Sequence, residues 1–279
     1  MRFNIIGAGR LGKNLALSLM SRGGCELVAV CNRRLNRAVA AVSELGSGIA
    51  VETLAALPAV DFTFITTPDD RIAGIAAELV ISSGIVVHCS GVLGSDVLVP
   101  LKKYGCLIAS IHPLRAFRKN NLQANALQDC DCVVEGDLRA VELLTTLFTR
   151  MGARVMPINP VKKNTYHAAA VMASNYIVTL AGCAVELLMD AGLSEIQAKG
   201  MTQRLMQSSL TNLQDTTHVA EALTGPLVRG DLNTIHQHLH AITTPHIDAL
   251  YRAAALATLP LINLDEDSLQ ALRKRLHER

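Results

Sequence analysis

Two kinds of hydrophobic pattern divide the chain. In its first half, short apolar runs alternate with stretches whose apolar residues recur every three or four positions, as in parallel strands and their crossover helices. Beyond Pro157-Ile158-Asn159-Pro160 no strand pattern returns. We therefore expect a doubly wound, mostly parallel α/β domain over residues 1–158 and an all-α domain over 159–279. The apolar runs lie at residues 3–6, 26–31, 61–68, 84–91, 108–114, 132–135 and 154–158.

The first apolar run ends in a glycine turn of the form Gly-x-Gly-x-x-Gly. Gly7 permits a tight turn, Gly9 lets the backbone approach a pyrophosphate, and Gly12 lets a helix pack closely on the strand. A helical pattern follows, so an anion would meet free N–H groups at a helix N-terminus. The segment predicts a dinucleotide site formed by Gly7, Ala8, Gly9, Arg10, Leu11 and Gly12.

The end of the second run bears on the choice of cofactor. A free ribose 2′-hydroxyl prefers an Asp or Glu about 20 residues past the glycines, whereas a 2′-phosphate needs a cation. The chain has Asn32, Arg33 and Arg34 there, and arginine donates bidentately to phosphate. We therefore expect NADP rather than NAD. The alternative is that both arginines are solvated charges at a helix start, and Arg37 could equally hold the phosphate.

Later strands should end at the same edge of the sheet as the glycine turn. Ligands of doubly wound sheets lie beyond the carboxyl ends of the strands. His112 stands before a proline at such an end and either touches the substrate or is structural. The strand-end candidates are Thr66, Thr67 and Pro68 beside the cofactor, and Ser90, Gly91 and His112 beside the substrate.

One long apolar segment, residues 164–190, opens the second half. It is long enough to cross a membrane, but Asn175 and Glu186 lie inside it and a soluble pattern precedes it. We therefore expect a buried central helix whose small residues allow close contacts within the domain or across a dimer. A homodimer through the helical domain is expected, and no membrane partner.

The start of this segment carries the candidate catalytic pair. Lys163 and His167 are four residues apart and share one helical face, which Ser174 continues. They would meet one ligand at the interdomain cleft, unless they are helix-start charges in solvent. Asn175 beside Ser174 and Arg229 in a Gly-Pro loop are further candidates for binding the substrate, although Arg229 could instead reach a cofactor phosphate or pair with a local acid.

Composition excludes several other classes. Twenty-six basic and 24 acidic side chains give a net charge of +2, with no basic block beside aromatic residues, so we expect no nucleic-acid partner. The first strand begins at Phe3, which leaves no room for a leader, and we expect a cytoplasmic protein.

Seven cysteines in mostly apolar runs indicate buried thiols. His236, His238 and His240 lack an acid or cysteine partner at ligand spacing, so no metal site is expected.

Several motifs together resemble a family of bacterial oxidoreductases that join a Rossmann-like NADP-binding domain to an uncharacterised helical domain. Related proteins are ketopantoate reductase, pyrroline-5-carboxylate reductase, prephenate dehydrogenase and the 6-phosphogluconate and β-hydroxyacid dehydrogenases. The resemblance covers nearly the whole chain and implies a second domain of the 6-phosphogluconate dehydrogenase C-terminal-like type. The motifs lie at residues 7–12, 88–91, 111–114, 166–170 with 174–176, and 223–226 with 229–231.

The resemblance implies residue roles and a reaction. A catalytic lysine of ketopantoate reductase and the β-hydroxyacid dehydrogenases is matched by Lys163, but His167 stands where those enzymes have asparagine. His112-Pro113 is similar to a His-Pro pair of prephenate dehydrogenase, without the continuation found there. The implied reaction is hydride transfer between NADPH and a small keto or imino acid, as in ketopantoate reductase. Alternatives are a prephenate dehydrogenase-like or pyrroline-5-carboxylate reductase-like activity, or a non-catalytic NADP-binding regulatory or redox-sensing protein.

Overall fold

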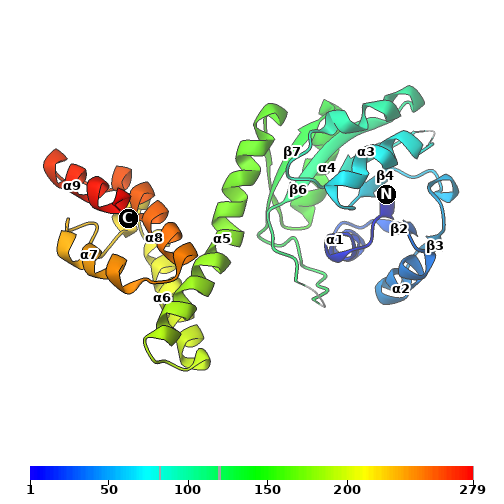
Figure 1. Cartoon of the computed structure of the whole chain (residues 1–279). Coiled ribbons are helices and arrows are strands. Elements are labelled where there is room, and N and C mark those ends of the chain that lie inside the picture. The colour runs from blue at the N-terminus through cyan, green and yellow to red at the C-terminus, as the bar shows by residue number, and fades with distance from the viewer. Residues whose placement is uncertain (82, 119–120, 279) are drawn as a thin grey trace. The chain divides into compact units, whose positions relative to one another are not determined.

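The computed structural model describes residues 1–81, 83–118 and 121–278. They form two compact units, Met1–Ser174 and Asn175–Arg279 (Figure 1). This division falls inside one long helix, whereas the patterns place the change of architecture after residue 158. The predicted domain limits therefore stay a prediction, and each unit is described by itself.

The first unit is built on one eight-stranded sheet of order β3-β2-β1-β4-β5-β6-β7-β8. All neighbouring strands are parallel except β6 and β7. This confirms the prediction of a doubly wound, mostly parallel sheet. The strands are β1 (Arg2–Ile6), β2 (Glu26–Cys31), β3 (Ile49–Val51), β4 (Phe62–Ile65), β5 (Ile85–His88), β6 (Leu107–Pro113), β7 (Asp131–Gly136) and β8 (Arg154–Pro157).

Helices cover both faces of this sheet because alternate side chains of the strands point to opposite sides. Ile5 belongs to a hydrophobic cluster with residues of α1, α2 and α4, and its neighbour Ile6 to a second cluster with residues of α3 and η2. The helices of this unit are α1 (Arg10–Ser21), α2 (Leu35–Leu45), α3 (Asp69–Glu78) and α4 (Leu138–Arg150), with 3₁₀ helices η1 (Leu54–Ala56), η2 (Ser95–Tyr104) and η3 (Pro160–Lys162).

The register of the central strands decides where ligands can bind. Ile6 pairs with Ile65, Ile65 with His88, and His88 with Ser110. The segments that leave β1, β4 and β5 therefore start at one edge, and the end of β6 lies beside them. The glycine turn, Thr66 and Ser90 are brought to this carboxyl edge, as their positions in the sequence predict.

The second unit is helical, as predicted, and its described residues contain no strand. Its small core is formed by Ile235, Ala255, Leu259, Leu272 and Leu276. These residues come from α7, α8, η5 and α9, so α5 and α6 contribute none of them. The elements are α5 (Lys163–Asp190), which begins in the first unit, α6 (Glu195–Gln214), η4 (Val219–Ala222), α7 (Leu232–Ala241), α8 (Pro245–Thr258), η5 (Leu259–Leu261) and α9 (Glu266–His277).

Helix α5 is not the buried central helix that its composition predicts. Lys163 is its only buried residue, and much of its apolar surface is exposed. With η3 it forms a 31-residue stretch, Pro160–Asp190, that is long and apolar enough to cross a membrane by length and composition alone. Because core helices of soluble proteins pass the same test, the expected absence of a membrane partner stays a prediction.

Candidate functional site

The glycine turn is shaped in two places by the fold itself. Gly7 has φ +95°, and a β-carbon added there would lie 2.6 Å from Thr67 Cγ2. A β-carbon added at Gly12 would lie 2.6 Å from the carbonyl oxygen of Gly7. Both glycines are therefore needed for the close packing of β1, α1 and the end of β4, as the sequence predicts.

Gly9 differs because none of the described residues fills the space beside it. A β-carbon there would have its nearest neighbour, the Gly7 carbonyl oxygen, at 4.0 Å, and φ is −80°, which any residue adopts. Gly9 is also the N-cap of α1, where no side chain accepts a hydrogen bond and the first turn holds no acid. Open space and uncapped N–H groups together suit the close approach of an anionic ligand.

A cavity of about 930 Å³ lies beside this turn, large enough for a cofactor. It brings together nine of the predicted cofactor residues, while Arg10, Leu11 and Gly12 do not line it. Carboxylates of Glu52, Asp70 and Glu78 also line it. The nine are Gly7, Ala8, Gly9, Asn32, Arg33, Arg34, Thr66, Thr67 and Pro68.

Hydrogen bonds of two polar side chains fix the shape of this cavity, and a third polar side chain has no partner among the described residues. Asn32 Oδ1 accepts a hydrogen bond of 2.8 Å from the N–H of Ala8, and Thr66 Oγ1 donates one of 2.8 Å to the Gly7 carbonyl. The Thr67 hydroxyl is buried and has no hydrogen-bond partner in the described part of the protein. A buried orphan hydroxyl at a cavity wall suits a polar group of a ligand.

Four arginines line the same cavity: Arg71 on α3 and the three that follow the second strand. Arg33, Arg34 and Arg37 line it and are exposed, and Arg34 is the N-cap of α2. None of the ion pairs found among the described residues involves them. Arginines that form no ion pair within the described part of the chain, next to an uncapped helix N-terminus, fit the phosphates of NADP.

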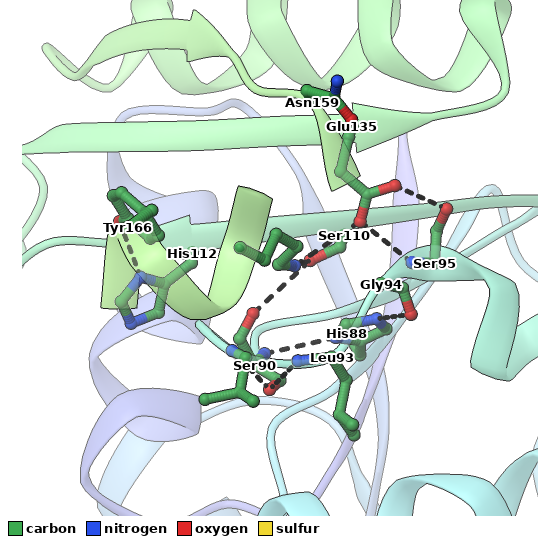
Figure 2. Close-up of polar contacts among 12 residues, drawn as sticks. His88, Ser90, Leu93, Gly94, Ser95, Ser110, His112, Glu135, Asn159 and Tyr166 are labelled. Carbon is green, nitrogen blue, oxygen red and sulfur yellow. Dashed lines mark hydrogen bonds and ion pairs between the residues drawn. The ribbon is translucent and has the colours of Figure 1, made fainter. Parts of the chain in front are cut away.

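A second polar cluster lies where β5 and β6 end (Figure 2). His88 Nε2 lies 3.0 Å from the Gly94 carbonyl, and Nδ1 accepts a hydrogen bond of 3.2 Å from the N–H of Ser90. A carbonyl only accepts and an amide N–H only donates, so His88 is neutral with its proton on Nε2. Burial, and then the charge of Lys163, lowers the pKa of His88 to about 4. His88 thus holds the turn after β5, and the hydroxyl of Ser90 accepts the N–H groups of Val92 and Leu93.

Lys163 is buried in the same cluster. Its Nζ donates a hydrogen bond of 2.5 Å to Ser110 Oγ and lies 3.4 Å from Glu135 Oε1, with its side chain only 2% exposed. Glu135 also accepts bonds of 2.9 and 2.7 Å from the N–H and hydroxyl of Ser95. Burial lowers the pKa of Lys163, and Glu135 opposes this shift. A solvated helix-start charge is therefore wrong for Lys163, and its catalytic role stays a prediction.

His112, Tyr166 and His167 form the outer part of the cluster. The Tyr166 hydroxyl lies 2.8 Å from His112 Nδ1, and the rings of His112 and His167 have centroids 5.7 Å apart. A β-carbon at Gly91 would lie 2.5 Å from His167 Nδ1 and 2.9 Å from His112 Cε1, so only glycine admits both imidazoles. The structure thus brings Gly91, His112 and His167 together, whereas Lys163 turns its ammonium to Ser110 and Glu135, and the predicted roles of these residues stay predictions.

The remaining predicted substrate residues make other contacts. Ser174 is exposed on α5 and its hydroxyl donates a hydrogen bond of 2.6 Å to the Ala170 carbonyl. Asn175 and Arg229 belong to the second unit, where Arg229 is close enough to Asp231 to contribute, after hydrogen bonds from Thr234, to lowering the pKa of that carboxyl. The roles of all three stay predictions, as does the absence of a metal site.

Four residues of the site were missed from the sequence. Ser95, Ser110 and Glu135 bind one another or Lys163, and Tyr166 binds His112. The role of Glu135 could have been predicted from the sequence, since it is the one acid in an otherwise apolar run over residues 132–135. A buried carboxylate needs a partner, and the lysine that opens the next helix is a candidate for it.

Comparisons with known proteins agree with this architecture. Residues 1–113 match a family described as a Rossmann-like domain, and residues 130–258 match one described as a domain of unknown function, DUF2520. No curated protein sequence matches the chain. The chain thus joins a Rossmann-like domain to a DUF2520 helical domain, as its motifs predict.

Solved structures share the fold at low sequence identity. A Thermotoga maritima protein has a TM-score of 0.70 at 24% identity, over 99% of this chain and 100% of its own. A provisionally named NADP oxidoreductase of Bacteroides fragilis has a TM-score of 0.76 at 21% identity, over 92% and 96%. The 1-pyrroline-5-carboxylate reductase of Streptococcus pyogenes has a TM-score of 0.62 at 17% identity, over 99% and 96%. At these identities the likeness is one of fold.

Proposed function

We propose that this chain, in which a Rossmann-like domain precedes a DUF2520 domain, is an NADP-dependent oxidoreductase that transfers hydride between NADPH and a small keto or imino acid. Ketopantoate is the first substrate to try, since Lys163 matches the lysine of its reductase. The observation that carries the proposal is the open space beside Gly9, on a cavity also lined by Arg33, Arg34 and Arg37, which form no ion pair with any described residue.

The protein's own groups would bind and orient the reactants. NADPH, when bound, supplies the hydride. The uncapped start of α1 and the arginines would bind its phosphates, and His112 and His167 would face the reacting group. The ammonium of Lys163, bonded to Ser110 and Glu135, would fix the position of the first turn of α5. It would thereby also position Tyr166 and His167, which lie three and four residues further along this helix.

The cofactor preference can be tested with the arginines. We expect the wild-type protein to bind NADPH at least ~10-fold more tightly than NADH, because charge-assisted bonds to a phosphate contribute about 1.5–3 kcal/mol. Arg33→Ser, Arg34→Ser or Arg37→Ser should reduce this preference, most for the residue that holds the 2′-phosphate. Cofactor fluorescence titration measures the affinities.

Arg139→Ser is the matched control, because Arg139 is exposed on α4 and pairs only with neighbouring Glu142 among the described residues. Equal affinity of the wild-type protein for NADH and NADPH would contradict the expected preference. Turnover is followed by loss of the NADPH absorbance with 2-oxo acids and cyclic imines. Tight NADPH binding with no turnover of any of them would favour the regulatory alternative.

We also propose that the second unit forms a homodimer through α5 and α6. Large apolar side chains are exposed there, among them Val178 (72%), Ile196 (87%) and Leu205 (71%), and a dimer that covers them would remove apolar surface from water. Val178→Asp should give a monomer in sedimentation experiments, while Leu138→Asp, at an equally exposed site on α4 (84%), should leave the dimer intact. A monomeric wild-type protein, or one that partitions into lipid vesicles, would contradict this proposal.

A further inference from the structure

Elementary chemistry decides which partner donates the hydrogen bond between His112 and Tyr166. The two rings meet edge to face, with centroids 5.7 Å apart and an angle of 85°, and the hydroxyl lies 2.8 Å from Nδ1 (Figure 2). Because a neutral imidazole has one N–H and one bare nitrogen, the pair can form in two ways. Either Tyr166 donates to a bare Nδ1, or Nδ1–H donates to the phenol oxygen.

Two conditions favour donation by Tyr166. Burial raises the pKa of Tyr166 well above its usual range, so the phenol keeps its proton and remains a donor. Burial, followed by the charges of His167 and Lys163, lowers the pKa of His112 to about 4, so the imidazole is neutral near pH 7 and has a bare nitrogen. The bare nitrogen is the more basic acceptor of the two groups, and Nδ1 is the one that the hydroxyl reaches.

The other ring nitrogen of His112 is the one that a ligand can reach. Nε2 of His112 forms no hydrogen bond with any described residue. This nitrogen is also absent from the buried atoms that lack a partner, so part of its surface is accessible. Nδ1 of His167, by contrast, is buried without a partner and faces Gly91. Nε2 of His167 is equally open, but of the two imidazoles only His112 has a hydrogen bond among the described residues that fixes which ring nitrogen carries the proton.

We propose that Tyr166 is a positioning residue that holds His112 with its proton on Nε2, and that this N–H donates to the carbonyl oxygen of a 2-oxo acid. The inference rests on the proposed function and deepens it by naming the substrate class. Hydride from NADPH forms the new C–H bond, the carbonyl π pair moves to oxygen, and NADPH becomes NADP⁺. Nε2–H stabilises the developing alkoxide, which takes its proton from solvent.

The charges around the pair disfavour a protonated cyclic imine. The N–H of His112 can donate a hydrogen bond to a carbonyl oxygen. It cannot accept one from the N–H of an iminium ion. Glu135, the carboxylate of this cluster, is already bound by Lys163 and Ser95. A cationic substrate would therefore meet two imidazoles and find no free carboxylate among the described residues of this cluster, whereas a 2-oxo acid brings a carboxylate and a carbonyl oxygen.

Nitrogen-15 NMR of the imidazoles tests the pair without any assay of turnover. In the wild-type protein, long-range ¹H–¹⁵N correlations should show His112 with a protonated Nε2 and a bare Nδ1, its signals being identified by their loss in His112→Gln. Tyr166→Phe keeps the packed ring and removes the hydroxyl, so His112 should change to a mixture of both tautomers. Circular dichroism checks that the variant is folded.

Tyr251→Phe is a close control. Tyr251 lies 2.8 Å from His238 Nδ1, with ring centroids 5.9 Å apart at 87°, but this second pair is in the other unit and His238 is exposed. It should leave the His112 signals unchanged. With a 2-oxo acid, Tyr166→Phe should lower kcat about 10- to 100-fold at unchanged affinity for NADPH, while Tyr251→Phe should not.

The outcomes separate the two claims. A protonated Nδ1 on His112 in the wild-type protein, or the same tautomer in Tyr166→Phe, overturns the role of Tyr166 whether or not a substrate is found. Full kcat in Tyr166→Phe, or reduction of cyclic imines in preference to 2-oxo acids, also overturns the inference while the oxidoreductase assignment stands. Failure of wild-type turnover with every substrate, together with the expected NMR result, contradicts the proposed function alone.

Discussion

Lys163→Ala is expected to lower the free energy of unfolding by about 3–5 kcal/mol, because it leaves a buried carboxylate without its cation. Glu135 is 6% exposed, and its only remaining partner in the described cluster would be Ser95. Ser110 would lose the ammonium that now bonds its hydroxyl. Urea unfolding followed by circular dichroism measures the loss.

Two further variants define what this loss means. Lys162→Ala changes the preceding, exposed lysine and should alter stability by less than ~0.5 kcal/mol. Replacing both partners, as in Lys163→Met with Glu135→Leu, should recover most of the stability, since a well-packed apolar pair is often as stable as a buried ion pair. If Lys163→Ala keeps wild-type stability but abolishes turnover, Lys163 is a catalytic group, as the sequence predicts, and its structural role here is wrong.

Gly9→Ala is expected to weaken NADPH binding about 100-fold, or ~2.7 kcal/mol, while leaving the protein as stable as the wild type. Among the described residues, the added methyl would meet no atom within 4 Å except the Gly7 carbonyl oxygen at 4.0 Å, and φ of −80° suits alanine. It would instead occupy the space through which a pyrophosphate approaches the start of α1. Isothermal titration calorimetry and thermal unfolding measure the two effects.

Gly7→Ala provides the contrast in the same turn. Its φ of +95° and the 2.6 Å approach to Thr67 Cγ2 predict a loss of stability before any effect on the cofactor. Wild-type NADPH affinity in Gly9→Ala would show that the pyrophosphate does not lie on this turn. It would also remove the main support for the proposed function.

Most of the sheet could be predicted from the sequence because its strands are short apolar runs buried on both faces. All four residues of β4 and of β5 are buried, so hydrophobicity alone marks them. Strand β3 was missed because it has three residues, of which one is buried. The antiparallel β7 was found as a strand but its direction was not, since direction depends on the connection from β6 rather than on composition.

The candidate site could be predicted only in part. Spacing placed Lys163 and His167 on one helical face, but spacing does not fix how deeply a side chain is buried. The ammonium of Lys163 goes to Ser110 and Glu135 on two strands that no local pattern connects to it. The exposure of α5 was missed for a related reason, because an apolar composition does not specify which surface covers it.

The bond between Asn32 and the glycine turn restricts how cofactor choice can change. Because Oδ1 of Asn32 accepts from the N–H of Ala8, position 32 must keep a side-chain oxygen at that reach if the turn is to keep its shape. Aspartate offers the same oxygen and adds a negative charge beside the ribose, where it would accept from a 2′-hydroxyl and repel a 2′-phosphate. Replacing one amide nitrogen by oxygen therefore offers a route from one nicotinamide cofactor to the other that leaves the architecture of the turn intact.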